Sequence, residues 1–515
     1  MTSSRAGRVK PAALLTFVLF TTLYGSLSVR AQRSQGSQGS SGLQRSDGSR
    51  GPLRALQREI DALLSAPGVD RGTWGVVVRS AASRELLYSM NGGKLFVPAS
   101  NMKILTLAAA ADRLGWDFSF ETRLVGAGAI DAGGLEGDLV VVGSGDPTID
   151  DWDGAATRLF QSWAEKLKGL GIHAIRGRIV GDDNSFDDDP WGSGWAWDDL
   201  DRSFAAGVGA LQFNQNTAQL RFKPAALAGD PAIVTIGPAG SGLELRNRTA
   251  TTAAHTSTSI EVRRRLDSPT LELRGSLPVT SGTIVRNVAV NNPTVYFVTE
   301  LRDALTAAGI EVRGRAVDID DIADPPSRAR GNVLLDHRSP PLSELASTMM
   351  RLSQNLYAET LLKTMGAQKA TGSSSSGRAA INEVLEGWGL AASDFRVVDG
   401  SGLSVYDLVT PDVLVSVLTH VAQDENLRGP FEAALPIAGR EGTLSQRMRG
   451  TAAEGNVRAK TGSLSNARAM SGYVRSAEGE LLVFSMLVNN FGASWEATDR
   501  TMDAIMVRLA QFTRR

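Results

Sequence analysis

The sequence contains no cysteine, and this absence excludes a group of chemistries. Disulfide bonds, thiol catalysis and cysteine-ligated metals all need the missing side chain. Histidine is also rare, and no H-E-x-x-H pattern for zinc is present. The four well-separated histidines are His173, His255, His337 and His420. We therefore predict no metal site and no cofactor.

The chain also lacks a strong net charge. Its 54 Lys and Arg residues nearly balance 55 Asp and Glu residues, which gives a net charge of −1 and a pI near 6.5. Arginine is scattered without a long basic run, so nothing indicates a nucleic-acid-binding surface. Hydrophobic residues at 42% and charged residues at 21% are normal for a globular protein. A length of 515 residues predicts two or three domains.

The N-terminus has the pattern of an export signal. Positive residues precede a mostly apolar run from Ala12 to Leu23, and small residues surround Ala31. The positive residues are Arg5, Arg8 and Lys10. We predict a signal peptide over residues 1–31, with an uncleaved signal anchor as the alternative. The mature protein is then expected in the periplasm or extracytoplasmic cell envelope, with at most peripheral membrane association.

Composition and periodicity divide the rest of the chain into four segments. Residues 32–52, rich in Ser, Gly and Gln, predict a flexible linker. Residues 53–116 predict a helix, a β-hairpin and a second helix, whereas 117–325 predict a mostly β block. Residues 326–515 predict several helices, with the Gly-Ser run at 372–377 as a loop, and a β-β-α end.

The two ends of the chain are expected to form one domain. A hairpin of two strands is marginal in water by itself. Strands near the C-terminus can extend it into an antiparallel sheet with helices on its faces. Residues 53–116 and 326–515 would then be two parts of one domain, into which residues 117–325 are inserted.

Ser100 and Lys103 form the pattern S-x-x-K at the start of a predicted helix, just after Pro98. Residues at i and i+3 share one helical face, so the hydroxyl and the amine are expected to lie together. A serine beside an amine that can lose its proton is one form of activated nucleophile. The alternative is an ordinary solvated helix face.

Two further motifs follow in order along the chain. Ser353 and Asn355 form S-x-N, and Lys460, Thr461 and Gly462 form K-T-G in a sequence where lysine is scarce. Singly, these residues have simpler explanations, such as helix capping or a turn. The ordered set S-x-x-K, S-x-N and K-T-G is typical of β-lactamases and penicillin-binding proteins.

On these motifs, the chain resembles a low-molecular-mass class C penicillin-binding protein, of the D-alanyl-D-alanine carboxypeptidase/endopeptidase family. The flanking stretches 143–147, 399–404 and 439–444 look like this family too. About 250 residues separate Ser100 from Ser353, which fits the large insertion of class C. The resemblance implies an α+β fold: a penicillin-binding/β-lactamase-like transpeptidase domain, an antiparallel sheet flanked by helices, split by a large, mostly β inserted region of one or two domains.

The resemblance also implies a mechanism. Ser100 attacks a D-alanyl carbonyl on peptidoglycan stem peptides, and Lys103 is the base once its pKa falls by about three units. Ser353 relays a proton as the third catalytic residue. The resemblance assigns substrate binding and the oxyanion hole to five residues: Asn355, Lys460, Thr461, Gly462 and Ser463. The expected enzyme is a serine D-Ala-D-Ala carboxypeptidase that β-lactam antibiotics such as penicillin inhibit covalently. D,D-endopeptidase action is not separable from it by sequence.

Other interpretations remain open. A β-lactamase or esterase can use the same site, and a catalytically silent peptidoglycan-binding protein can keep the fold. A Ser-His-Asp hydrolase is not indicated, because no G-x-S-x-G is present. The aspartates at 182–189 lack EF-hand spacing and predict a solvated or structural loop. Asp146 and Asp399 are interpreted as turn formers.

Overall fold

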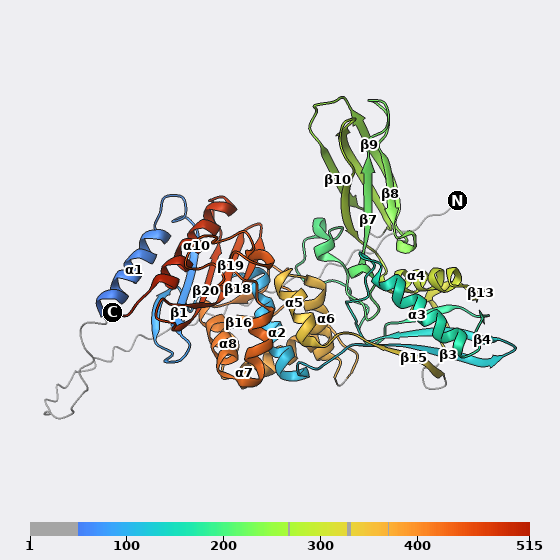
Figure 1. Ribbon diagram of the computed structural model, residues 1–515, viewed down its shortest axis with the longest axis horizontal. Helices are drawn as coiled ribbons and strands as arrows, with labels where there is room; N and C mark the ends of the chain where they lie inside the picture. Colours follow the sequence, from blue (N-terminus) through green and yellow to red (C-terminus); the bar gives the residue numbers. More distant parts are fainter. Residues whose placement is uncertain (1–49, 266–267, 327–330, 369) are drawn as a thin grey trace, which may run out of the picture. The chain divides into compact units, whose positions relative to one another are not determined.

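The structure, a computed structural model, describes residues 50–265, 268–326, 331–368 and 370–515 (Figure 1). The predicted signal peptide and residues 32–49 of the predicted linker lie outside these ranges. Among the described residues, no helix has both the length and the hydrophobicity needed to cross a bilayer. Helix α1 (Arg50–Leu64) includes residues 50–52, so it begins earlier than predicted.

One antiparallel sheet joins the two ends of the chain, as the sequence predicted. Its strands are β1 (Thr73–Ser80), β2 (Leu86–Met90), β18 (Arg458–Leu464), β19 (Ala467–Arg475) and β20 (Leu481–Asn489). The strand order is β18-β19-β20-β1-β2, so β20 pairs with β1 (Figure 1). The N-terminal hairpin therefore becomes part of a five-stranded sheet.

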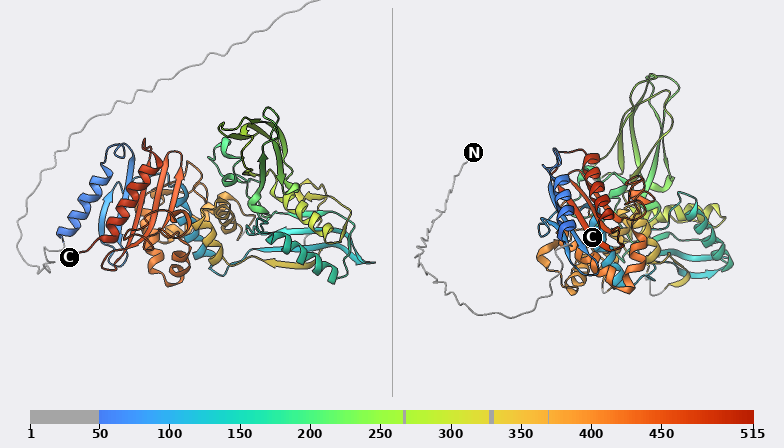
Figure 2. Two further views of the ribbon diagram at one scale, coloured as in Figure 1. Left: turned by 45° about the horizontal axis from the view of Figure 1, so that its top comes forward. Right: turned by 60° about the vertical axis from the view of Figure 1, so that its left-hand side comes forward.

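Helices cover both faces of this sheet (Figure 2). Successive residues of a strand point to opposite faces. Val76 and Val78 pack in a core with α1 and α10 (Trp495–Gln511). Val77 packs in the core that contains α2 (Met102–Leu114) and α8 (Pro411–Gln423). Each fully buried valine contributes about 1.5–3 kcal/mol. The predicted α+β arrangement is confirmed.

Four further helices pack around α2. They are α5 (Leu342–Arg351), α6 (Asn355–Gly366), α7 (Ser374–Gly387) and α9 (Glu425–Ala434), with short paired strands β16 (Phe395–Arg396) and β17 (Leu408–Val409) nearby in the chain. The loop predicted at residues 372–377 is wrong, because α7 already begins at Ser374. Ser373 and Ser376 each accept the other's backbone N–H at 3.0 Å, and this capping box starts the helix.

A mixed sheet is built from strands at the beginning and at the end of the predicted inserted region. Its strands are β3 (Glu121–Asp131), β4 (Gly134–Gly143), β5 (Ala174–Ile175), β6 (Ile179–Asp182), β13 (Glu311–Val312), β14 (Ala316–Asp318) and β15 (Asn332–Arg338). Helices α3 (Ala155–Gly169) and α4 (Pro293–Ala307) share its core, where Phe160 and Phe297 have ring centres 5.5 Å apart. Strand β15 pairs with β3, so this sheet continues beyond residue 325 to Arg338.

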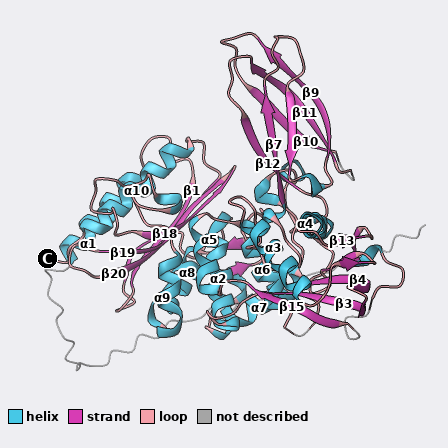
Figure 3. Cartoon of the chain, turned by 45° about the vertical axis from the view of Figure 1, so that its right-hand side comes forward, coloured by secondary structure: helices cyan, strands magenta, loops and turns pink. Residues whose placement is uncertain are grey.

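Two three-stranded sheets account for the stretch from about 210 to 290 that the sequence predicted as β (Figure 3). One has the order β12-β7-β8 and the other β10-β11-β9. Their strands are β7 (Thr217–Lys223), β8 (Ile233–Gly237), β9 (Glu244–Thr252), β10 (Ser259–Arg264), β11 (Thr270–Pro278) and β12 (Ile284–Ala289). Phe222 of β7 and Leu273 of β11 belong to one buried core, which holds the two sheets together.

One buried lysine holds the acidic, tryptophan-rich segment that follows β6. Lys363 on α6 donates to Asp187 Oδ1 at 2.6 Å and to the carbonyl oxygen of Asp189 at 2.7 Å. Farther along, the Trp195 indole N–H donates to Asp399 at 2.9 Å. These contacts attach the segment to α6 and to the turn at 399–404, so it has a structural role.

A Lys363→Met variant is expected to lose about 1–3 kcal/mol of unfolding free energy, because hydrogen bonds from a charged donor disappear. The Asp187 side chain is 32% exposed, so water can hydrate the carboxylate that remains. Urea unfolding measures the change. The control is Lys166→Met at an exposed lysine on α3, expected within about 0.5 kcal/mol of the parent. Equal losses in both variants would contradict the role of Lys363.

Candidate active site

Ser100 lies in a short 3₁₀ turn, Ala99–Asn101, that runs directly into α2. Ala99 has a φ of +46°, a left-handed conformation that costs a residue with a Cβ about 1–3 kcal/mol. Gly402 packs against this turn so closely that a Cβ on it would collide with the Ala99 carbonyl oxygen. The turn that presents Ser100 is therefore held from outside by the segment around Gly402.

Lys103 lies beside Ser100, as the i, i+3 spacing predicts. Its Nζ is 3.0 Å from Ser100 Oγ and donates to Asn355 Oδ1 at 2.6 Å and to the Ser401 carbonyl at 2.7 Å. The side chain is fully buried. This burial lowers the pKa of Lys103 to about 7, although the carboxyl groups of Asp399 and Glu359 act in the opposite direction. An amine with this pKa is about half unprotonated at pH 7, so it can act as a base near neutral pH.

Ser353 and Lys460 form a second serine–lysine pair. Ser353, between α5 and α6, has a φ of +60°, so its backbone is also in the left-handed region. Lys460 Nζ donates to Ser353 Oγ at 2.8 Å and to the Thr461 carbonyl at 2.7 Å. Burial, and then the charge of Lys103, hold the pKa of Lys460 well below its ordinary value. Each of the two serines thus contacts one buried amine.

Asn355 is the first residue of α6, but it does not cap the helix. Gln354 is the cap, since its side-chain oxygen accepts the Leu356 N–H at 3.2 Å. The capping alternative for Ser353 and Asn355 is therefore wrong. Besides its contact with Lys103, Asn355 donates through Nδ2 to the Phe204 carbonyl at 2.8 Å. Asn355 thus connects Lys103 to a segment of the predicted inserted region.

Strand β18 carries the K-T-G motif at the edge of the central sheet. The Thr461 hydroxyl donates to Thr443 Oγ1 at 2.7 Å. A Cβ on Gly462 would lie 2.8 Å from the Pro98 carbonyl oxygen and 3.0 Å from the Ser100 nitrogen. The glycine therefore allows β18 to approach the Ser100 turn.

These residues surround one cleft of about 400 Å³. The predicted residues that line it are Ser100, Ser353, Asn355, Thr461 and Ser463. Lys103, Lys460 and Gly462 are buried next to it. Other lining residues are Asp199, Phe204, Gly402, Leu403, Thr443, Leu464, Ser465 and Trp495. The structure thus brings all the predicted site residues together, and it adds Asp199 and Phe204 from the predicted inserted region.

Buried carboxyl groups beside Lys103 were not predicted as site residues. Glu359 accepts the Ser401 N–H at 2.7 Å, which fixes the residue whose carbonyl binds Lys103. Burial raises the pKa of Glu359 to about 8. Glu359 follows Asn355 by four positions on α6, so the helical spacing of an S-x-N-x-x-x-E pattern was a signal for it.

Asp399 forms the turn at 399–404, in agreement with its interpretation from sequence. Its carboxylate accepts the Gly402 and Ser404 N–H groups at 2.6 Å each. Asp407 accepts the Val398 N–H at 2.6 Å, and its burial raises its pKa well above the ordinary value. The acids on both sides of the turn therefore hold the backbone that contacts Lys103 and Ala99.

The fold and the Ser100–Lys103 pair are typical of serine acyl-transfer enzymes of the penicillin-binding type. The chain belongs to the D-Ala-D-Ala carboxypeptidase 3 (S13) family, whose profile matches residues 56–512. It is accordingly a serine-type D-Ala-D-Ala carboxypeptidase, as the resemblance in its sequence implied.

Individual relatives agree with this assignment. The chain is 36% identical over 524 residues to a D-alanyl-D-alanine carboxypeptidase of Actinomadura sp. (strain R39), covering 99% of this chain and 92% of that protein. It is 28% identical over 425 residues to D-alanyl-D-alanine carboxypeptidase DacB of Haemophilus influenzae, covering 81% and 85%. The crystal structure of penicillin binding protein 4 (dacB) from H. influenzae matches with a TM-score of 0.76 at 27% identity, covering 87% and 97%. The predicted family resemblance and fold class are confirmed.

Proposed function

We propose that this enzyme removes the terminal D-alanine from peptidoglycan stem peptides through an acyl-enzyme on Ser100. One observation carries the proposal: the fully buried Lys103 amine, with a pKa lowered to about 7, lies 3.0 Å from Ser100 Oγ. A general base works best when its pKa is near the working pH. The Lys103 amine can thus take the hydroxyl proton and activate the serine.

In the acylation step, Ser100 Oγ bonds to the carbonyl carbon of the penultimate D-alanine, and its proton passes to Lys103 Nζ. The carbonyl oxygen becomes an oxyanion, which the backbone N–H groups of Ser100 and Ser463 bind. The close approach of Gly462 to the Ser100 nitrogen supports this pairing of β18 with the turn. One such donor is worth about 3–4 kcal/mol of barrier.

The C–N bond then breaks, and the leaving D-alanine nitrogen takes a proton through the Ser353 hydroxyl. The contact of Ser353 with Lys460 supports this relay, since it connects the hydroxyl to a buried amine. The proton that Lys103 received from Ser100 is the one that reaches the leaving nitrogen, so the Lys103 amine is neutral again. Water next attacks the ester on Ser100 and gives a proton to Lys103, which passes it to Ser100 Oγ as the shortened peptide is released. Asn355 holds Lys103 in position throughout.

The free carboxylate of the terminal D-alanine is bound by Lys460, Thr461 and Ser463 at the edge of β18. A β-lactam carbonyl presents the same target to Ser100, so penicillins acylate this serine and inhibit the enzyme. A second crystal structure of the H. influenzae protein, complexed with a β-lactam, matches with a TM-score of 0.71 at 25% identity and supports this proposal.

We also propose that the enzyme acts outside the cytoplasm, on the basis of the signal peptide predicted over residues 1–31. Its catalytic domain comprises residues 53–116 and the C-terminal part of the chain, with residues from 117 onward inserted between them. Strand β15 supports an insertion that ends near Arg338 rather than at 325, because it pairs with β3. Both halves of the catalytic domain contribute residues to the cleft.

Release of D-alanine from a peptidoglycan pentapeptide, measured with the purified enzyme, tests the proposal. We expect steady release together with slow, burst-limited turnover of a chromogenic cephalosporin, because the acyl-enzyme with a β-lactam hydrolyses slowly. Rapid cephalosporin turnover without D-alanine release would favour a β-lactamase instead. Absence of both reactions would favour a silent peptidoglycan-binding protein. Mass analysis of cross-linked muropeptides in parallel reports any endopeptidase action.

A further inference from the structure

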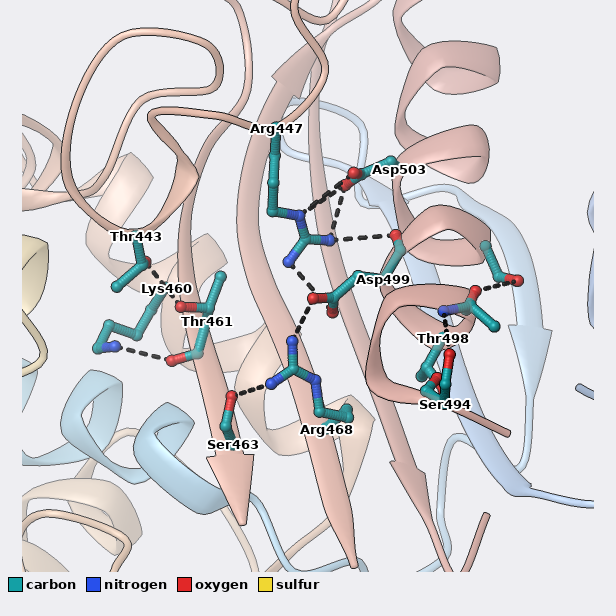
Figure 4. Close-up of polar contacts among 12 residues, drawn as sticks. Thr443, Arg447, Lys460, Thr461, Ser463, Arg468, Ser494, Thr498, Asp499 and Asp503 are labelled. Atoms are coloured by element: carbon teal, nitrogen blue, oxygen red, sulfur yellow. Dashed lines mark hydrogen bonds and ion pairs between the residues drawn. The ribbon is translucent and has the colours of Figure 1, made fainter. Parts of the chain in front are cut away.

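Arg468 lies directly behind the cleft, and none of the site motifs contains it. It is on β19, opposite Ser463 of the edge strand β18. Its Nη1 group donates a hydrogen bond to Ser463 Oγ (Figure 4). Arg468 is only 9% exposed, whereas Ser463 is exposed at the cleft. A buried cation thus contacts a hydroxyl that substrate can reach.

Two residues of helix α10 hold the guanidinium of Arg468 in place. Asp499 accepts a hydrogen bond from Nη2 of Arg468, and the Trp495 ring centre lies 5.1 Å from the guanidinium carbon. The Asp499 carboxylate is also 3.3 Å from Nη1 of Arg447, whose Nη2 binds Asp503 at 2.6 Å (Figure 4). Two arginines and two aspartates therefore balance their charges and hold Arg468 in one orientation.

The contact with Arg468 determines whether the Ser463 hydroxyl acts as a hydrogen-bond donor or acceptor toward other groups. A serine hydroxyl has one donor and two acceptor positions, whereas arginine has donors only and remains charged. Ser463 Oγ must therefore accept from Arg468, and its own hydrogen is left for another partner. The Thr461 hydroxyl differs, because in this structure it donates its hydrogen to Thr443 and must turn away from that partner to bind a carboxylate.

We propose that Arg468 is a positioning residue for carboxylate recognition. By occupying an acceptor position of Ser463, it turns the Ser463 hydroxyl hydrogen toward the terminal carboxylate of the substrate. The nearby positive charge also polarises this hydroxyl, which strengthens it as a donor. The inference rests on the proposed function, in which Ser463 binds that carboxylate, and it adds the residue that sets the direction of the hydrogen bond.

An Arg468→Leu variant tests this role with two substrates. One is an acyl-D-alanyl-D-alanine peptide with its free carboxylate, and the other is an acyl-D-alanyl thioester of a neutral thiol. We expect kcat/KM for the peptide to fall about tenfold or more, mainly through KM, because a hydrogen bond to a charged group is lost. For the thioester, which has no carboxylate to bind, we expect kcat/KM within about twofold of the parent.

Two variants accompany the test. Arg468→Lys keeps a cationic donor without an acceptor, so it should recover part of the activity toward the peptide. Arg475→Leu removes an exposed arginine from the same strand and should change neither substrate. Equal losses on both substrates would mean a merely structural role and would overturn the inference, as would an unchanged peptide rate. Failure of the parent enzyme to release D-alanine would instead overturn the proposed function, and it is seen before any variant is compared.

Discussion

A Ser100→Ala variant is expected to lose covalent penicillin labelling completely and to release D-alanine more slowly by on the order of a million-fold. The methyl group cannot form the ester, and the other hydroxyl that contacts a buried amine, Ser353, belongs to a different pair. Mass spectrometry of the intact protein after exposure to penicillin measures the adduct. The parent should gain one adduct per chain and the variant none.

Ser65→Ala is the matched control for this experiment. Ser65 is exposed, and its hydroxyl bonds only locally, to the Asp61 carbonyl at 2.7 Å. Penicillin should label this variant to the same extent as the parent, and the variant should release D-alanine at the parent rate. Thermal unfolding of Ser100→Ala should show a folded protein, so that its loss is chemical. An adduct that persists in Ser100→Ala would refute Ser100 as the nucleophile and would direct attention to Ser353.

Much of the fold was predictable because it follows from local pattern and from one physical need. The run of β-branched residues from Val76 to Val78 predicts a strand, and a lone hairpin needs further strands to be stable. The return of the C-terminal strands to β1 answers that need. The end of the inserted region was harder to predict from sequence. It depends on the pairing of β15 with β3, which lies about 200 residues earlier in the chain.

The candidate site likewise contains some contacts that the sequence predicts and others that it does not. Ser100 and Lys103 are joined by helical spacing, so their contact could be inferred from sequence alone. Arg468 is only five positions from Ser463, yet their contact depends on the register of the turn between β18 and β19. The sequence also contains no sign that Phe204 would reach Asn355, since that contact joins two separate segments of the chain.

Lys103→Gln is expected to slow acylation by about 10²- to 10⁴-fold, the usual contribution of a general base. Glutamine can still donate to the Asn355 side chain and to the Ser401 carbonyl, but it cannot take the proton of Ser100. Stopped-flow measurement of acylation by a fluorescent penicillin reports the loss. Lys94→Gln, at an exposed lysine, is the control and should acylate at the parent rate. Normal acylation by Lys103→Gln would remove Lys103 as the base.

The pH dependence of the parent enzyme tests the same assignment by a different route. Since burial lowers the pKa of Lys103 to about 7, the amine is protonated and inactive below this pH and neutral above it. We expect kcat/KM to fall tenfold per pH unit below about 7 and to level off above it. In Glu359→Gln this limb should persist near the same pH, because burial raises the pKa of Glu359 to about 8 and its carboxyl group is therefore mostly protonated and uncharged near pH 7. Loss of the limb in Glu359→Gln would assign it to the carboxyl group, whose own pKa is about 8.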